Sequence, residues 1–222
     1  MNFQKILMTI FYVGLVCLGL TACDKNTVSN EIKNIINAKQ SQNTSYKNGK
    51  IVGNEYINES LGLKFVLPKD YRFLTDDEIA AATNMGIDEF VDKSKADTDK
   101  LKKQAATQME MAAITTISYI SNLNLIVRDF PLNIDEETLA KKVKEEVKSM
   151  IANGNIIYYE DSRQNLGEIE FYVLSQDLVF DGEKTHQKQF IKLLNKKVVT
   201  ITFTYESEDE LKKMINAFQK IE

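Results

Sequence analysis

The sequence predicts an α+β fold in which an antiparallel β-sheet is flanked by helices, as in an α/β/α sandwich. Three observations predict it. From residue 51 onward, segments of alternating apolar and polar residues recur, short turn sequences separate them, and each helical segment carries one apolar stripe. Antiparallel strands covered by one-sided helices are typical of this class. The sequence has no internal repeat, so residues 51–222 are expected to form a single domain.

The composition argues against several classes of function. The chain has 28 Lys and Arg against 32 Asp and Glu, whereas a nucleic-acid-binding protein needs a basic stripe that displaces counterions. One His and two Cys leave too few ligands for a zinc site of the usual type. No glycine-rich loop follows a strand to hold phosphate. We therefore expect no nucleic-acid partner, no bound metal and no cofactor.

The first residues have the layout of a secretory signal peptide. One cation, Lys5, precedes an apolar stretch over residues 6–20, and a polar sequence follows Cys23 at once. An uncleaved transmembrane helix is the alternative, because the apolar stretch reaches the lower limit of spanning length. Gly14 and Gly19 weaken such a helix, and no cluster of Lys or Arg follows it. The sequence therefore favours a signal peptide.

The end of this segment, Leu20-Thr21-Ala22-Cys23, resembles the lipobox of bacterial lipoproteins. The resemblance implies cleavage between Ala22 and Cys23, formation of S-diacylglycerol cysteine at Cys23 and acylation of the new amine. The residue types suit this chemistry, because a thiol is the most nucleophilic side chain near neutral pH. Several acyl chains hold a protein stably on a bilayer. We expect removal of residues 1–22 and attachment of the mature chain to a membrane.

Residues 23–50 are expected to form a flexible tether behind the lipidated cysteine. They are rich in Asn, Lys, Ser, Gln and Thr, and bury too little apolar surface to offset the entropy of ordering. A docked helix around residues 31–39 is the alternative. Asp24 resembles the signal that retains enterobacterial lipoproteins in the inner membrane. We expect the cell envelope: the periplasmic face of the inner membrane in a Gram-negative cell, or the outer face of the plasma membrane in a Gram-positive cell.

The first half of the domain contains two strands, two helices and a hairpin. Strands are predicted over residues 56–58 and 61–67, with Pro68 ending the second. Thr75 and Glu78 form a capping box that begins a helix extending to about Met85. A surface helix is expected in the charged segment 88–110, where Leu101, Ala105 and Met109 form a stripe. A hairpin around Ser121-Asn122 is predicted from residues 112–119 and 123–130.

The second half contains a helix, four strands and a closing helix. Asn133 and Glu136 are expected to cap the first helix. The strands are predicted over residues 156–160, 168–180, 185–194 and 197–205, with turns at Asp181-Gly182 and Asn195-Lys196. In the last strand three threonines alternate with three apolar residues, which predicts one wet and one buried face. Ser207 and Glu210 are expected to begin a final helix whose inward stripe extends to Ile221.

Two segments resemble a known family. Residues 56–68, YINESLGLKFVLP, are similar to the start of PsbP-like lipoprotein domains, which also follow a lipobox and a polar tether. The final strand and capped helix, residues 198–221, are similar as well, and DcrB-like envelope lipoproteins share this ground plan. Segment 88–110 departs from the compact DcrB-like pattern. No catalytic motif defines the family, so the resemblance implies a fold and an envelope location but no reaction.

Few side chains suggest chemistry. His186 is the single histidine and lies in a polar strand start, where a solvated residue is expected rather than a general base. The carboxylate pairs Asp76-Asp77 and Glu136-Glu137 fall in first helical turns, where they favour the helix dipole. The remaining candidates are acidic, aromatic and methionine groups for which solvated or core positions are expected. These are Asp88, Asp92, Asp97 and Asp99; Tyr158, Tyr159, Tyr172 and Tyr205; and Met85, Met109 and Met111.

A lipid-anchored, non-enzymatic envelope protein is therefore the leading hypothesis. It would contact another envelope component through one face of its sheet or through segment 88–110. One alternative is an envelope hydrolase whose carboxylates meet only on folding. Another is a lipid- or peptide-binding module, which needs a deep apolar cavity between helices and sheet.

Overall fold

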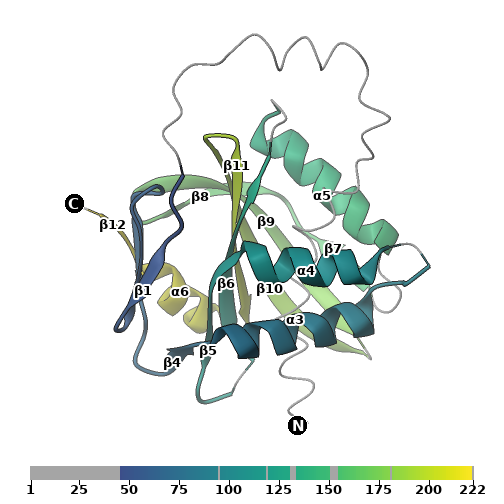
Figure 1. The fold of residues 1–222 in the computed structure, drawn as a ribbon, viewed down its shortest axis with the longest axis horizontal. Helices are drawn as coiled ribbons and strands as arrows, with labels where there is room; N and C mark the ends of the chain where they lie inside the picture. The colour runs from purple at the N-terminus through teal and green to yellow at the C-terminus, as the bar shows by residue number, and fades with distance from the viewer. Residues whose placement is uncertain are drawn as a thin grey trace.

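The computed structural model describes residues 46–94, 96–118, 120–130, 134–150, 155–180 and 182–221 (Figure 1). The expected signal peptide, Cys23 and the tether up to residue 45 lie outside these residues. None of the helices that the described residues form has the length and apolar content needed to cross a membrane.

The described residues form the following strands and helices, given in chain order. They are β1 (Lys50–Val52), β2 (Glu55–Asn58), β3 (Leu63–Val66), β4 (Tyr71–Phe73), α3 (Asp76–Phe90), α4 (Thr98–Gln108), β5 (Met109–Thr115), β6 (Asn122–Asp129), α5 (Glu136–Met150), β7 (Asn155–Tyr158), β8 (Ser162–Leu166), β9 (Ile169–Phe180), β10 (Glu183–Leu194), β11 (Lys197–Tyr205), α6 (Glu208–Asn216) and β12 (Phe218–Lys220).

These strands form two antiparallel sheets. The central sheet has eight strands in the order β4-β5-β6-β11-β10-β9-β7, and β8 also pairs with β9. The second sheet has four strands in the order β1-β2-β3-β12. The three predicted hairpins are confirmed by the pairs β5–β6, β9–β10 and β10–β11. The turn predicted at residues 121–122 is wrong in position, because β5 ends at Thr115 and Asn122 already pairs with Ile114 as part of β6. The predicted α+β class is confirmed.

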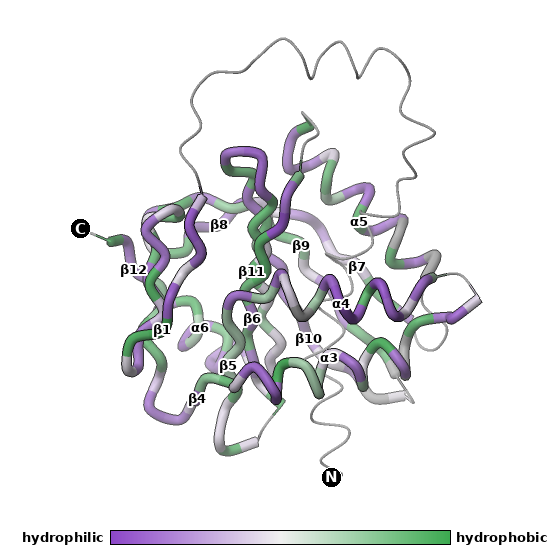
Figure 2. The backbone as a smooth tube through the Cα atoms, viewed as in Figure 1, coloured by the Kyte–Doolittle hydropathy of each residue, from purple (hydrophilic) through white to green (hydrophobic). Residues whose placement is uncertain are grey.

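Helices cover one face of the central sheet (Figure 1). Ile87 of α3 and Leu101 of α4 belong to one apolar cluster with two residues of β5, Ala112 and Ile114. α5 packs on the same face but over different strands, where it contacts β9 and β10. Along α5 hydrophilic and hydrophobic segments alternate turn by turn, as expected for a helix with one buried face (Figure 2).

The opposite face of the central sheet is covered by α6 and the second sheet. Their shared core contains a group of phenylalanines from both sheets, in which Phe65 lies beside Phe218 and Phe203 also contacts Phe218. The predicted final helix through Ile221 is wrong beyond residue 216, because Phe218–Lys220 form β12. Pairing with β3 satisfies backbone groups at an edge that would otherwise be open.

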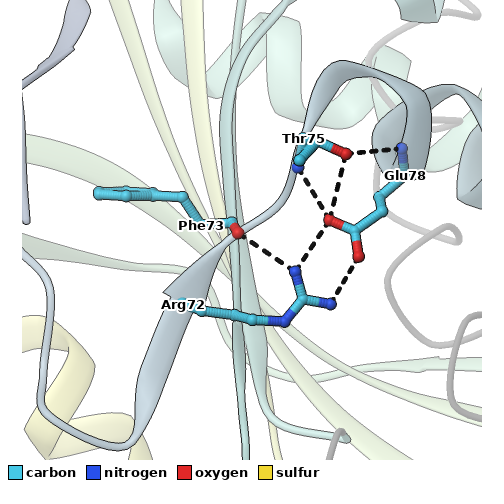
Figure 3. A network of polar contacts seen from close by, with 4 residues as sticks. All are labelled: Arg72, Phe73, Thr75 and Glu78. Carbon is cyan, nitrogen blue, oxygen red and sulfur yellow. Dashed lines mark hydrogen bonds and ion pairs between the residues drawn. The ribbon is translucent and has the colours of Figure 1, made fainter.

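The capping box predicted at the start of α3 is confirmed (Figure 3). The Glu78 backbone N–H donates to Thr75 Oγ1 over 3.3 Å, and the Thr75 N–H donates to Glu78 Oε2 over 2.9 Å. Arg72 binds the same carboxylate in two places, at 2.8 and 2.7 Å. The Arg72 guanidinium and the Thr75 N–H lower the pKa of Glu78 to about 2. α3 continues past the predicted end near Met85 to Phe90.

Two further helices begin at side-chain caps. Asp97 Oδ1 accepts the Lys100 N–H at the start of α4, and the predicted stripe on this helix is buried at Leu101 and Ala105. At α5 the predicted cap Asn133 lies outside the described residues. There Asp135 Oδ1 accepts the Thr138 N–H over 2.7 Å.

Candidate functional site

A strip of neutral polar side chains lies on the helix-covered face of the central sheet, at its centre. The sequence predicts that Thr200, Thr202 and Thr204 face water, and this prediction is wrong, because they are 2%, 0% and 0% exposed. Amide side chains on the neighbouring strands are buried beside them. We call this group the amide strip: Asn122, Asn124, Gln176, Gln187, Gln189, Thr200, Thr202 and Thr204.

The strand register explains how the amide strip forms. Thr202 pairs with Asn124 on β6 and with Gln189 on β10, so these three residues form one row across the sheet. Thr204 pairs in the same way with Asn122 and Gln187, which forms a second row. Within one sheet face, residues two apart on a strand are neighbours. The strip is therefore a grid of side chains over β6, β11 and β10, extended by Gln176 on β9.

Only part of the amide strip is satisfied by hydrogen bonds. In the second row Gln176 Nε2 donates to Gln187 Oε1, and Gln187 Nε2 donates to Thr204 Oγ1, each over 3.0 Å. The following buried atoms of the strip have no hydrogen-bond partner in the described part of the chain: Asn122 Oδ1, Asn124 Nδ2 and Oδ1, Gln176 Oε1, Gln189 Nε2 and Oε1, and Thr202 Oγ1.

Such unpartnered atoms are costly. Each buried donor or acceptor that lacks a partner lowers the free energy of unfolding by about 1–3 kcal/mol, and native proteins contain few of them. In the strip they are concentrated in the row Asn124, Thr202 and Gln189. Chemically, this row offers amide donors, amide acceptors and a hydroxyl without any formal charge. It is suited to a neutral polar ligand that both donates and accepts hydrogen bonds.

Apolar clusters border the amide strip on both sides. Ala112 and Ile114 on β5 belong to the cluster under α3 and α4, and they pair directly with Asn124 and Asn122. On the other side, Leu174 pairs with Gln189 and belongs to the cluster under α5. The two helical groups thus pack on the flanks of the sheet face, and the polar rows lie between their apolar clusters.

A second polar assembly lies on the opposite face of the central sheet, around Asp177. Its side chain is 2% exposed and binds three groups. The Tyr159 hydroxyl donates to Oδ2 over 2.5 Å, Lys184 Nζ lies 2.9 Å from Oδ2, and His186 Nδ1 lies 2.7 Å from Oδ1. The His186 ring also stacks on Tyr205 at a centroid distance of 5.6 Å.

The Asp177 assembly orients the histidine. Burial alone would raise the pKa of Asp177, but hydrogen bonds from Tyr159, Lys184 and His186 more than offset it, and the pKa is lowered. An ionised carboxylate can only accept, so His186 Nδ1–H donates to it and Nε2 is left as the other ring nitrogen. The imidazole side chain is 43% exposed. His186 is partly exposed to solvent, as expected, but its ring is also bound by the buried carboxylate of Asp177.

Asp177 is a functional candidate that the sequence interpretation missed. The signal was present, because the hairpin predicted around residues 181–182 pairs position 177 with position 186, as the register of β9 and β10 shows. The amide strip had a weaker signal. Its amides and threonines alternate with other residues on separate strands, and only the strand order β6-β11-β10 places them side by side.

A third polar group holds the N-terminal residues on the domain. Glu110 is the extra residue at a register shift between Met109 and Met111, and such a bulge re-aims a side chain. Its carboxylate accepts four hydrogen bonds, two from tyrosine hydroxyls, one from a backbone N–H and one from a side-chain amide. The donors are Tyr46, Tyr56, Gly49 and Asn58. Contacts of the domain therefore extend to Tyr46, within the stretch expected to be tether.

A cavity of about 260 Å³ lies beside Glu110. Its polar lining mixes both charges, and Lys197 is paired with Asp129 over 2.9 Å. The lining residues are Asn48, Thr107, Gln108, Glu110, Val127, Arg128, Asp129 and Lys197. Because opposite charges neutralise one another there, the cavity shows no preference for a ligand of either sign.

The other carboxylates singled out in the sequence occupy structural positions. Asp76-Asp77 and Glu136-Glu137 lie in the first turns of α3 and α5, as expected. Asp88 pairs with two lysines of the same region, Lys93 and Lys102. Asp92 accepts hydrogen bonds from Ser94, Asp97 caps α4, and Asp99 lies in its first turn. Among the described residues, no three His, Cys, Asp or Glu side chains converge as a metal site would require.

The aromatic and methionine candidates are mostly packed. Tyr172 and Tyr205 are buried, whereas Tyr159 is 48% exposed and binds Asp177. Tyr158 is half-buried, with two lysine ammonium groups over its ring. Met111 is buried in the core between the sheets, and Met85 and Met109 are half-buried. The three methionines therefore do not share one contact surface.

Comparisons with known proteins give structural likenesses only. No protein-family model matches the sequence, and no curated protein matches it. Among solved structures, the chain is similar to cyanobacterial PsbP (CyanoP) from Synechocystis sp. PCC 6803, at 10% identity and a TM-score of 0.45, over 82% of this chain and 98% of that one. It is also similar to a protein from Bacteroides thetaiotaomicron VPI-5482, at 10% identity and a TM-score of 0.41, over 77% and 49% of the chains.

A further likeness is to LpqN of Mycobacterium tuberculosis, which is described as involved in cell envelope biogenesis. The identity is 13% and the TM-score is 0.35, over 70% of this chain and 76% of that one. Each of these likenesses is to an overall fold, at low sequence identity.

Proposed function

We propose that this chain is a lipid-anchored protein of the bacterial cell envelope that acts by binding another envelope component rather than by catalysis. The sequence Leu20-Thr21-Ala22-Cys23 supports the anchor, because it resembles a lipobox and follows an apolar signal segment. The anchoring residue is Cys23, and the membrane is the first partner. Asp24 supports the inner membrane as the location in a Gram-negative cell.

The amide strip is the single observation that carries the binding role. Its row Asn124, Thr202 and Gln189 is fully buried and contains five side-chain atoms without a partner among the described residues. A ligand that supplies those hydrogen bonds recovers free energy that the unliganded protein lacks. The strip has no strongly nucleophilic or acidic side chain, so its chemistry is that of recognition.

The anchor is tested by comparing Cys23→Ala with Cys17→Ala in growing cells. Intact-mass measurement of the isolated protein should show a cleaved chain carrying acyl groups for the wild type and for Cys17→Ala. Cys23→Ala should lack the acyl mass and keep residues 1–22, because the peptidase requires the modified cysteine in lipoproteins of this kind. If Cys23→Ala stays in the membrane fraction with the same amino terminus as the wild type, the lipoprotein assignment is wrong.

The binding role is tested by crosslinking in intact cells, with the full chain and with the double variant Asn124→Leu/Gln189→Leu. We expect the same envelope component to be captured repeatedly by the wild type and lost from the variant. The control Thr185→Val changes a residue of β10 outside the strip and should capture as the wild type does. Repeated capture of no partner, together with turnover of an envelope substrate by the purified chain, would overturn the proposal.

The Asp177–His186 pair favours one second candidate, an envelope hydrolase. A carboxylate that holds Nδ1 leaves Nε2 to accept a proton, which is the geometry of a general base. This candidate requires that the purified chain hydrolyse an envelope substrate and that His186→Gln abolish the reaction. Loss of the reaction in Asp177→Asn with retained folding would assign the orienting role to Asp177.

A further inference from the structure

We propose that the cavity beside Glu110 binds a free α-amino acid in its zwitterionic form, with a short polar side chain. This site is separate from the amide strip, and the proposal goes beyond the binding role described above. Four features of the described residues carry it: the strand edge at the cavity, the size and polarity of the cavity, the balance of charge in its lining, and an ion pair at its wall.

The cavity lies where β5 begins. Met109, the first residue of β5, pairs with Ile126 of β6. β6 continues to Asp129, and in the described part of the chain no strand pairs with residues 127–129 on the β5 side. These three residues line the cavity together with Asn48 and the end of α4. A strand edge presents backbone N–H and C=O groups, so a ligand here meets both main-chain and side-chain partners.

The size and lining of the cavity limit the ligand to a small polar molecule. A volume of about 260 Å³ corresponds to about nine water molecules at about 30 Å³ each, and so to a ligand of about nine non-hydrogen atoms. Val127 is the one apolar residue in the lining. A fatty acyl chain or a large aromatic group would find few apolar contacts there, whereas a small polar amino acid matches both size and polarity.

The charge of the lining favours a ligand that carries both signs and no net charge. Two lining residues are cations, Arg128 and Lys197, and two are anions, Glu110 and Asp129. A phosphate, a dicarboxylate or a polyamine would leave an excess of one sign in the cavity, and an unpaired charge is costly to bury. A zwitterion keeps the balance, and its charge-assisted hydrogen bonds are about twice as strong as those of a neutral ligand.

The ion pair between Asp129 and Lys197 sets the spacing of the two ligand charges. Lys197 Nζ lies 2.9 Å from Asp129 Oδ1, and the Asp129 side chain is 87% exposed. Water screens an exposed pair, so opening it costs little. A zwitterion that enters between the two side chains exchanges one ion pair for two, because its carboxylate binds Lys197 and its ammonium group binds Asp129.

The short distance within this pair selects an α-amino acid among zwitterions. Since the Lys197 and Asp129 groups start in contact, the ligand charges that separate them must also lie close together. In an α-amino acid a single carbon carries both charged groups. In ethanolamine phosphate, by contrast, two carbons and an oxygen separate the nitrogen from the phosphorus.

Ligand binding is expected to stabilise the N-terminal residues on the domain. Asn48 lines the cavity, and the residues around it, Tyr46 and Gly49, donate hydrogen bonds to Glu110. Lys197 Nζ also lies 5.5 Å from the centre of the Tyr46 ring. Because residues 46–49 complete the wall of the cavity, a ligand that needs this wall shifts the equilibrium toward the docked segment.

The test uses the full chain as isolated from cells in detergent, and it titrates neutral polar amino acids by calorimetry. We expect the wild type to bind at least one of glycine, serine, threonine, asparagine and glutamine. The N-acetyl derivative and the amide of that amino acid should each bind at least tenfold more weakly, because each lacks one of the two charges. The affinity should also fall at least tenfold for Lys197→Met and for Asp129→Asn.

Matched controls are Lys142→Met and Asp99→Asn, because both residues are exposed and neither lines the cavity. Both variants should bind the amino acid as the wild type does. Hydrogen exchange at Gly49 and Lys50 should slow when the amino acid is added to the wild type, and should slow less in Lys197→Met. The two derivatives are compared on the wild type alone, so their result stands even where a variant fails to fold.

Four results would overturn the proposal. They are binding of none of these amino acids at up to about 10 mM, equal binding of the N-acetyl and amide derivatives, tighter binding of glycerophosphoethanolamine than of any amino acid, and an affinity that Lys197→Met and Asp129→Asn leave unchanged. The second result would indicate a neutral polar ligand, the third a lipid headgroup, and the fourth a different site.

Discussion

At the scale of single residues, Thr202 shows that an alternation of apolar and polar residues does not predict which side chains are exposed to solvent. Its position between apolar neighbours on β11 predicts a solvent-facing side chain, whereas the side chain is completely buried. Alternation separates two faces of a strand but does not say what covers each face. The polar face of β11 is buried because the amides of β6 and β10 lie beside it and helices pack on its flanks.

Thr202→Val is predicted to raise the free energy of unfolding of the unliganded chain by about 1 kcal/mol, because it removes a buried hydroxyl that lacks a partner among the described residues. The matched change Thr204→Val should lower that free energy by about 1 kcal/mol, since Thr204 Oγ1 accepts a hydrogen bond from Gln187. Urea unfolding of both variants measures the difference. Equal losses in the two variants would contradict the unpartnered state of Thr202.

The stability supplied by Asp177 is predicted to depend on pH. Its folded-state pKa is lowered, so its contribution is present above the unfolded value of about 3.9 and is lost as the pH falls through the folded value. Asp177→Asn should therefore be less stable than the wild type by about 1–3 kcal/mol at pH 7. This difference should shrink below about pH 4, as urea midpoints measured from about pH 7 to about pH 2.5 would show. A constant difference over that range would refute the prediction.

At the scale of elements, the second sheet was the largest omission. Strands β2 and β3 of this sheet were predicted, but β1 and β12 were not. In the central sheet, β4 and β8 were not predicted either, and each of these four strands is short or polar. A segment of three residues carries too little periodicity to distinguish a strand from the end of a helix. The helix stripe predicted through Phe218 and Ile221 fitted a 3.6-residue period, and pairing with the edge of β3 decided otherwise.

Phe218→Ala is predicted to lower the free energy of unfolding by about 3–5 kcal/mol, because Phe218 is buried between the sheets beside Phe65 and Phe203. Gln219→Ala, on the adjacent exposed position of β12, should change it by less than about 0.5 kcal/mol. Thermal or urea unfolding of the two variants measures the contrast. A small effect at Phe218 would show that β12 contributes little to the domain.

At the scale of the whole molecule, Glu110 connects parts of the chain that lie far apart in sequence. Its carboxylate binds the N-terminal segment through Tyr46 and Gly49, and it binds β2 through Tyr56 and Asn58. Burial and the Glu110 carboxylate raise the pKa of Tyr46 and of Tyr56 above the ordinary range, so both hydroxyls remain donors. The Glu110 carboxylate on β5 therefore connects residues 46–49 with the central sheet and with β2 of the second sheet.

Glu110→Ala is predicted to release residues 46–49 from the domain and to lower the free energy of unfolding by at least about 2 kcal/mol, because buried donors lose their acceptor. Hydrogen exchange should rise at Gly49 and Lys50, and limited proteolysis should cut near them. The exposed residue Glu59 provides the control, and Glu59→Ala should leave exchange and cleavage unchanged. Unchanged protection in Glu110→Ala would contradict this role.

The sequence by itself determined the α+β class, the helix caps at Thr75 and Ser207 and the hairpins at residues 181–182 and 195–196, because caps, turns and alternation act between residues close in the chain. It also contains the lipobox-like sequence, which is a local motif. Only the tertiary structure decided that Asn124, Thr202 and Gln189 meet in one row, since three separate strands contribute them. Contacts between distant segments depend on strand order, and local patterns do not encode that order.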